Sequence, residues 1–118
     1  MKGENAMPTI FLHMIEGISK EQKKNMVKQV SEAAAKDVGL AVEKVRVILT
    51  ERSPENMSIG GKLLDDNKSL YPIAFVNTKA GKSDELLKGL RQHISEAISE
   101  TCGIPIEQIS IYFVEHRV

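Results

Sequence analysis

The chain has 118 residues, of which 16 are Lys or Arg and 16 are Asp or Glu, so its formal net charge at pH 7 is zero. A chain of this length builds one compact domain or two very small ones. Its balanced charge and 4% aromatic content argue against a nucleic acid or an anionic membrane as a partner. The lone Cys102 excludes an internal disulfide and, since no signal peptide or membrane-spanning run is seen, we expect a cytoplasmic protein.

The first half of the chain reads as a strand, a helix and a second strand. Residues 9–15 are almost continuously apolar, as in a strand that is covered on both faces. Ser19, with Gln22 three residues later, predicts a helix N-terminus with a capping box. Apolar residues then recur at helical spacing as far as Gly39, the expected left-handed C-cap. From Val45 onward, alternation predicts the second strand.

The second half repeats this order after a polar connection. Residues 52–70 contain Pro, Gly, Asn and Asp, and we predict that they form no element of their own. Residues 72–76 then read as a strand, and Ser83 predicts the N-cap of a second helix. Alternating apolar side chains over residues 109–113 predict the last strand.

The two halves align without a gap when Pro8 is placed over Pro72. Twelve of the 44 aligned positions are identical, including Phe11 with Phe75 and the Ser-Glu-Ala run that starts at residue 31. A fixed internal period of this kind indicates a repeat. We therefore interpret the chain as a tandem duplication, with repeats at residues 7–64 and 65–118 that together form one compact domain.

The duplication predicts the architecture. A helix that connects two short strands makes them parallel, so two such units give a four-stranded sheet with two helices on one face, an α/β (α+β) fold. The other face of the sheet then has no helix to cover it, although its strands are apolar. Homo-oligomerisation is the simplest way to bury that face.

Three segments of the first repeat resemble the 4-oxalocrotonate tautomerase family. They are Pro-Thr-Ile-Phe-Leu-His-Met-Ile-Glu-Gly-Ile-Ser-Lys-Glu-Gln-Lys-Lys from Pro8, Val-Arg-Val-Ile-Leu-Thr-Glu from Val45, and the Ile-Gly-Gly of residues 59–61, which matches the family's hairpin. Residues 72–115 look like a second, divergent copy. The resemblance implies a fused two-copy member of the tautomerase superfamily that forms a trimer, as macrophage migration inhibitory factor does.

The family's catalyst is an amino-terminal proline, and the matching residue here is Pro8. A free α-amino group has a pKa of roughly 7.7–8.0, and an apolar pocket with nearby cations lowers that pKa. Such a secondary amine is a competent general base for moving a proton between oxygen and carbon of an enol acid. The resemblance therefore implies an isomerase that needs no cofactor and acts on small 2-hydroxy-dienoate or enol acids, with a small carboxylate as its substrate.

Pro8 is not the first residue of the chain, and two interpretations follow. If translation begins at Met7, removal of that methionine frees the amine of Pro8. If residues 1–7 remain attached, the nitrogen of Pro8 is a tertiary amide without a basic lone pair, and the site is silent or works differently.

The resemblance also assigns substrate-binding residues. Arg46 matches the family's arginine on the second strand, which binds a carboxylate, and a guanidinium suits bidentate binding. The family's other arginine is replaced by Ile18, but the second repeat carries Lys79 and Lys82 at its first strand-helix turn. We therefore expect one shared site per chain, with Pro8 and Arg46 from the first repeat. Met57 falls where the family has an aromatic pocket residue. The alternative is that Arg46, Lys79 and Lys82 are ordinary surface cations.

Two other functions remain open. A hydratase or dehalogenase of unsaturated acids would need a water-activating carboxylate, for which Glu16 and Glu51 are the candidates. A non-catalytic trimer that binds a ligand or a partner would result if Pro8 is not freed. No metal is expected, because the three histidines show no metal-site spacing and no Cys/His or carboxylate cluster accompanies them.

Overall fold

The computed structural model describes residues 8–64 and 69–116, which fold into two α-helices, three one-turn 3-10 helices and six strands in this part of the chain. The elements are β1 (Thr9–Ile15), α1 (Lys20–Val38), β2 (Arg46–Arg52), β3 (Ser58–Ile59), β4 (Lys62–Leu63), β5 (Ile73–Lys79), α2 (Asp84–Cys102) and β6 (Ser110–His116). β1, α1 and β2 recur 64 residues later as β5, α2 and β6 with unchanged lengths. The tandem βαβ duplication is therefore confirmed. The proposed limits of the repeats, 7–64 and 65–118, include residues outside the described ranges and stay a prediction.

Both helices begin and end as the sequence predicts. The side chain of Ser19 accepts a hydrogen bond from the backbone N–H of Gln22, whose own side chain returns to the backbone of Ser19, which is the predicted capping box. Ser83 caps α2 through the N–H of Leu86. Each helix ends at a glycine in the left-handed region, where a side chain would be strained.

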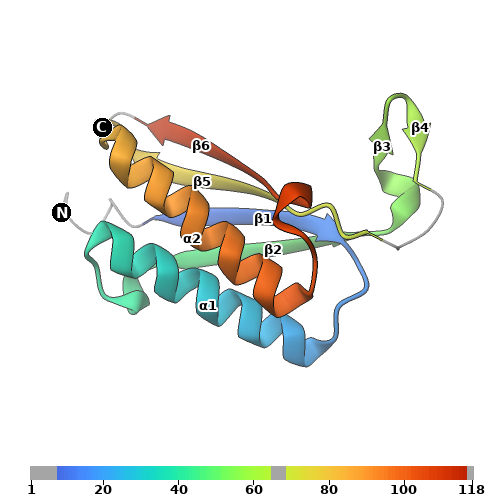
Figure 1. Cartoon of the computed structure of the whole chain (residues 1–118), viewed down its shortest axis with the longest axis horizontal. Coiled ribbons are helices and arrows are strands. Elements are labelled where there is room, and N and C mark those ends of the chain that lie inside the picture. The colour runs from blue at the N-terminus through green and yellow to red at the C-terminus, as the bar shows by residue number, and fades with distance from the viewer. Residues whose placement is uncertain (1–7, 65–68, 117–118) are drawn as a thin grey trace.

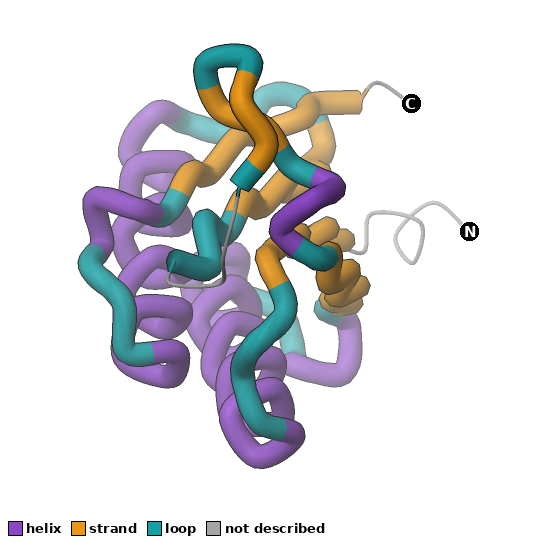
Figure 2. The backbone as a smooth tube through the Cα atoms, turned by 90° about the vertical axis from the view of Figure 1, so that its right-hand side faces the viewer, coloured by secondary structure: helices purple, strands orange, loops and turns teal. Residues whose placement is uncertain are grey.

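The four long strands form one sheet in the order β2-β1-β5-β6. β1 pairs with β2, and β5 with β6, in parallel, whereas the two central strands are antiparallel. In the central pair Phe11 lies opposite Phe75, its own counterpart in the other repeat. An approximate twofold axis at this pair therefore relates the repeats. Both helices cover the same face of the sheet (Figures 1 and 2), as predicted.

The core lies between this face and the helices. Inward-facing side chains of all four strands meet the apolar stripes of the helices, and several are completely buried; the largest include Ile10, Leu12, Met26, Leu90, Ile94 and Ile98. In the described part of the chain, neither helix is long and apolar enough to cross a bilayer.

The connection between the repeats is more structured than the sequence predicts. β3 and β4 form an antiparallel hairpin, so the expectation that residues 52–70 hold no element is wrong. Its turn is Gly60-Gly61, and both glycines have positive φ angles, 62° and 82°, as a tight two-residue hairpin turn requires. The family resemblance did indicate this hairpin. Residues 65–68 lie outside the described ranges.

β5 is also longer than predicted. The expected strand covers residues 72–76, but the ladder with β6 continues through Asn77, Thr78 and Lys79. These polar residues carry no apolar periodicity, and their extended backbone follows from pairing with a strand that lies more than 30 residues later. Lys79 is therefore a strand residue and not a turn residue.

The face of the sheet opposite the helices is open in the single chain and carries exposed apolar side chains across its middle. A row of large side chains crosses all four strands in register: Ile48, Phe11, Phe75 and Tyr112. Ile48, Phe75 and Tyr112 are exposed, and the Phe75 and Tyr112 rings stack with centroids 5.4 Å apart. We call this surface the open face.

We predict that Ile94→Ala will lower the free energy of unfolding by about 2–5 kcal/mol, because Ile94 is completely buried and its loss leaves a cavity. Urea denaturation at one fixed protein concentration measures the change. Gln92→Ala, on the exposed side of the same helix, is the control and should change stability by no more than about 0.5 kcal/mol. Equal effects of the two substitutions would contradict this assignment of the core.

Candidate active site

β1 and β2 begin, and β5 and β6 end, at the same end of the sheet (Figure 1). Pro8 lies at this end, directly before β1, and we call it the Pro8 edge. On one side, the backbone N–H of Arg46 donates a hydrogen bond of 3.0 Å to the carbonyl of Pro8. On the other side, Thr9 pairs with Asn77, so the last residues of β5 run past Pro8. The two central strands therefore bring Pro8 of one repeat beside the end of the first strand of the other.

Strand alternation separates the side chains near Pro8 onto two faces. Arg46 is exposed and shares a face with Ile48, while Lys79 is exposed and shares a face with Phe75. Both cations therefore belong to the open face, on the strands that flank the beginning of β1. Pro8 is buried, and its alternation with Thr9 places its ring on the helix-covered face.

Lys82 lies on the loop between β5 and α2, directly before the cap residue Ser83. Its side chain is half-buried. The N-terminus of α2 follows, and the partial positive charge of a helix N-terminus favours anions. Four of the five predicted site residues (Pro8, Arg46, Lys79 and Lys82) thus lie at one edge of the sheet.

Met57 lies elsewhere. It immediately precedes β3, and the β3–β4 hairpin extends from the opposite end of the sheet (Figure 1). There it lines a small apolar cavity of about 240 Å³ together with His13, Tyr71 and Phe75. A single chain therefore does not bring Met57 to Pro8.

The two candidate carboxylates for water activation also lie far from Pro8. Glu51 is five residues after Arg46, about 16 Å along β2, and its carboxylate accepts a 2.6 Å hydrogen bond from the ammonium of Lys23. Glu16 follows the end of β1, at this same distant end of the sheet. Within one chain, neither carboxylate reaches the edge that holds Pro8.

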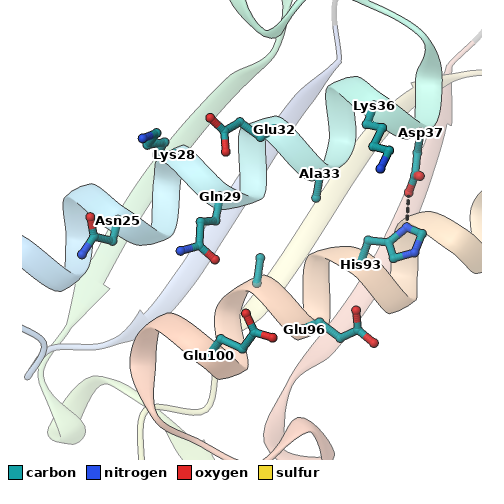
Figure 3. A pocket seen from close by; sticks show the side chains of 11 residues that line it. Asn25, Lys28, Gln29, Glu32, Ala33, Lys36, Asp37, His93, Glu96 and Glu100 are labelled. Carbon is teal, nitrogen blue, oxygen red and sulfur yellow. Dashed lines mark hydrogen bonds and ion pairs between the residues drawn. The ribbon is translucent and has the colours of Figure 1, made fainter.

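A groove between the two helices has a different character. It runs between the outer sides of α1 and α2, has a volume of about 560 Å³ and is lined mainly by polar side chains (Figure 3). His93 and Asp37 join its two walls, with 2.8 Å between Nδ1 and Oδ2. None of the predicted site residues lines it, and we assign it no role in catalysis.

Other reactive groups do not form a site in the described part of the chain. Cys102 is buried, and its burial raises the pKa of the thiol, an effect that the hydrogen bond with Thr101 only partly opposes. A thiol in that state is a poor nucleophile. Among residues 8–64 and 69–116, no group of three His, Cys, Asp or Glu side chains is placed to hold a metal ion.

Sequence reasoning missed one polar residue at this edge, Thr78. It is 4% exposed, and its Oγ1 atom is buried without a hydrogen-bond partner, the only such side-chain atom found in the described ranges. The available signal was a difference between the repeats, because the counterpart of Thr78 is the apolar Met14.

Comparisons with known proteins identify the family of the first repeat. The sequence profile of the Tautomerase family, described as a tautomerase enzyme, matches residues 8–67 and so begins at Pro8. A probable tautomerase of Lactiplantibacillus plantarum is 40% identical over 63 residues, which are 53% of this chain and 98% of that protein. A 2-hydroxymuconate tautomerase of Pseudomonas putida is 41% identical over 56 residues, which are 48% of this chain and 89% of that protein.

The structural match extends through both repeats. A wild-type fused 4-OT, solved as an asymmetric trimer, superposes with a TM-score of 0.83 at 22% identity, covering 92% of this chain and 86% of that one. The fold is therefore that of the fused tautomerases. The chain belongs to the Tautomerase family. It is an isomerase of the tautomerase type, with two βαβ units in one polypeptide.

We predict that the Cys102 thiol makes stability fall at alkaline pH. Folding raises the pKa of this thiol, so the folded state favours the neutral form. The stability that results is complete below the ordinary pKa of a cysteine and is lost as the pH rises through the pKa of the folded state. Between about pH 8 and pH 10, the parent should lose more free energy of unfolding than Cys102→Ala does. Urea denaturation across this range measures both proteins, and parallel pH profiles would contradict the prediction.

Proposed function

We propose that this tautomerase interconverts the enol and keto forms of small 2-hydroxy-dienoate or enol acids without a cofactor, with Pro8 as the amino-terminal general base. The observation that carries the proposal is the pairing of β1 with β2 and β5, which puts Arg46 and Lys79 on the strands that flank Pro8. The start of the family match at Pro8 supports the same role, as do relatives that are 2-hydroxymuconate tautomerases.

Each residue then has a defined part in the reaction. The substrate lies over the beginning of β1 on the open face, where Arg46 and Lys79 bind its carboxylate and the oxygen that becomes the enolate. Lys82, near the N-terminus of α2, adds positive potential. These cations stabilise the negative charge that develops as Pro8 takes the proton from carbon or oxygen. One such site forms per chain, because the second repeat has Ser110 in place of Arg46.

The proposed active form is a homo-trimer. The open face carries exposed aromatic and aliphatic side chains that a second copy would bury, and the fused 4-OT that superposes on this chain is a trimer. Association also offers a way for Met57 of one copy to line the pocket around Pro8 of another. A cytoplasmic location remains a prediction from the sequence.

The hydratase or dehalogenase alternative is less well supported. Its two candidate carboxylates lie at the far end of the sheet, and Glu51 is paired with Lys23. The non-catalytic alternative depends on whether the amine of Pro8 is free. The next experiment distinguishes the tautomerase, the hydratase and the non-catalytic functions.

We predict that turnover requires a chain that begins at Pro8. Two genes, one starting at Met1 and one at Met7, are expressed, and intact mass identifies the first residue of each product. Ketonisation of 2-hydroxymuconate and phenylenolpyruvate is then followed by ultraviolet absorbance. The chain that begins at Pro8 should turn over, and Pro8→Ala should lower its kcat by about 10²–10⁴-fold because the secondary amine is lost.

Pro72→Ala is the matched control, since Pro72 is the counterpart of Pro8 inside the chain and should change kcat by no more than a few-fold. Full turnover by a chain that keeps residues 1–7 would overturn the proline mechanism. Hydration without ketonisation would support the hydratase alternative, and binding of either acid without turnover would support the non-catalytic one.

We also predict that the cations of both repeats contribute to turnover. Arg46→Ala and Lys79→Ala should each lower kcat/KM by about 10²–10³-fold, the usual cost of removing one well-placed group that stabilises an oxyanion. Lys82→Ala should act in the same direction, whereas Lys24→Ala, an exposed lysine of α1, should have no effect. If Lys79→Ala and Lys82→Ala are both neutral, the repeats do not share a site.

A further inference from the structure

Thr78 is the one buried polar side chain at the Pro8 edge whose presence the packing does not explain. Its neighbours on the same side of β5, Ala74 and Val76, are apolar and belong to the core. In the part of the chain that the structure describes, its hydroxyl is the only buried side-chain oxygen or nitrogen without a hydrogen-bond partner. Leaving such a group without a hydrogen bond costs free energy of folding, so we expect the Thr78 hydroxyl to have a partner in the active form.

The strand register identifies the nearest residue across the sheet. Thr9 pairs with Asn77, and continuing this register by one residue places Thr78 opposite Pro8. The Pro8 carbonyl is turned toward β2, where it accepts the N–H of Arg46. Pro8 and Thr78 therefore form a pair without backbone hydrogen bonds between them, the kind of pair in which facing side chains come closest, with Cα atoms about 4.5 Å apart.

The two side chains also share a face. Pro8 and Thr78 are both buried and both alternate with residues of the open face, so both lie on the helix-covered side of the sheet. With residues 1–7 attached, the Pro8 nitrogen has no hydrogen to donate. A free Pro8 is a secondary amine with one N–H, or two when it is protonated.

The other repeat provides an internal comparison. The twofold relation places Met14 beside Pro72 as it places Thr78 beside Pro8. Pro72 lies inside the chain, its nitrogen is always an amide, and its neighbour is a buried, apolar side chain. The hydroxyl thus occurs beside the proline that can become a free amine and is missing beside the proline that cannot.

We propose that the Thr78 hydroxyl accepts a hydrogen bond from the amine of Pro8 and holds its lone pair toward the open face. This inference rests on the proposed function of Pro8 and adds a positioning residue to it. One N–H of the amine points to Thr78 on the helix side, which leaves the lone pair directed at the substrate between Arg46 and Lys79. When the amine accepts the substrate proton, the bond to Thr78 becomes stronger because its donor is now charged.

The bond has a measurable consequence for the pKa of Pro8. A hydrogen bond that is stronger to the protonated form stabilises that form and raises the pKa. Thr78→Val keeps the shape but removes the acceptor, so it should lower the pKa of Pro8 by about half a unit to one unit. Loss of the preferred orientation should also lower kcat by about three- to tenfold. Thr78→Ser keeps the hydroxyl, so it should leave both the Pro8 pKa and kcat close to those of the parent.

The test uses the form that begins at Pro8, which keeps every described helix and strand because all of them follow that residue. Titration of ¹⁵N-proline-labelled protein by NMR reads the Pro8 amine directly, without an activity assay. A crystal structure of the same form should place the Pro8 nitrogen about 2.7–3.2 Å from Oγ1 of Thr78. Thr101→Val is the matched control, since the hydroxyl of Thr101 already donates to the carbonyl of Ala97 at 2.7 Å; it should leave the Pro8 pKa unchanged.

A second measurement separates this role from simple packing. In the chain that keeps residues 1–7, Thr78→Val should raise the urea midpoint, because it removes an unpaired buried hydroxyl. In the chain that begins at Pro8, the same substitution should lower the midpoint, because it removes a formed bond. The proposal requires both the lowered pKa and this change of sign. An unchanged or raised Pro8 pKa, or the same sign in both chains, overturns it; activity of Pro8→Ala would instead overturn the proposed function alone.

Discussion

The antiparallel pairing of β1 with β5 is the contact on which the candidate site depends. It joins the repeats at their Phe11 and Phe75 counterparts, and it turns the second repeat around so that the end of β5 meets the beginning of β1. A parallel pairing would put the beginning of β5 beside Pro8, and Thr78 and Lys79 would lie at the opposite end of the sheet. The shared edge, with Arg46 on one side and Lys79 on the other, exists because backbone hydrogen bonds fix this register.

The same pairing explains how two repeats with one fold can carry different residues near their prolines. Each repeat keeps the caps, the buried helix stripe and the strand lengths of the other, because these features determine whether the unit folds. The positions that differ are those near the prolines: Arg46 against Ser110, Ile18 against Lys82, and Met14 against Thr78. In the proposed mechanism, duplication therefore lets one copy present an amine while the other provides charge and a hydroxyl.

The open face links folding to function. The helices cover only one side of the sheet, so the aromatic row through Phe75 and Tyr112 remains exposed in a single chain. Burying this row against another copy would also enclose the side of the sheet that carries Arg46 and Lys79. Exclusion of water strengthens the interaction of cations with a developing enolate, so in the proposed trimer association and catalysis would use the same surface.

The sequence by itself determined the duplicated units, both capping residues of each helix and the strands with strong apolar alternation, because these follow from periodicity and local hydrogen bonding. Together with the family resemblance it also pointed to Pro8, Arg46, Lys79 and Lys82. Only the tertiary structure decided that β5 extends to Lys79, that Met57 lies at the distant end, and that Thr78 is buried opposite Pro8. Those features depend on pairing between strands far apart in the chain, which local residue patterns do not encode.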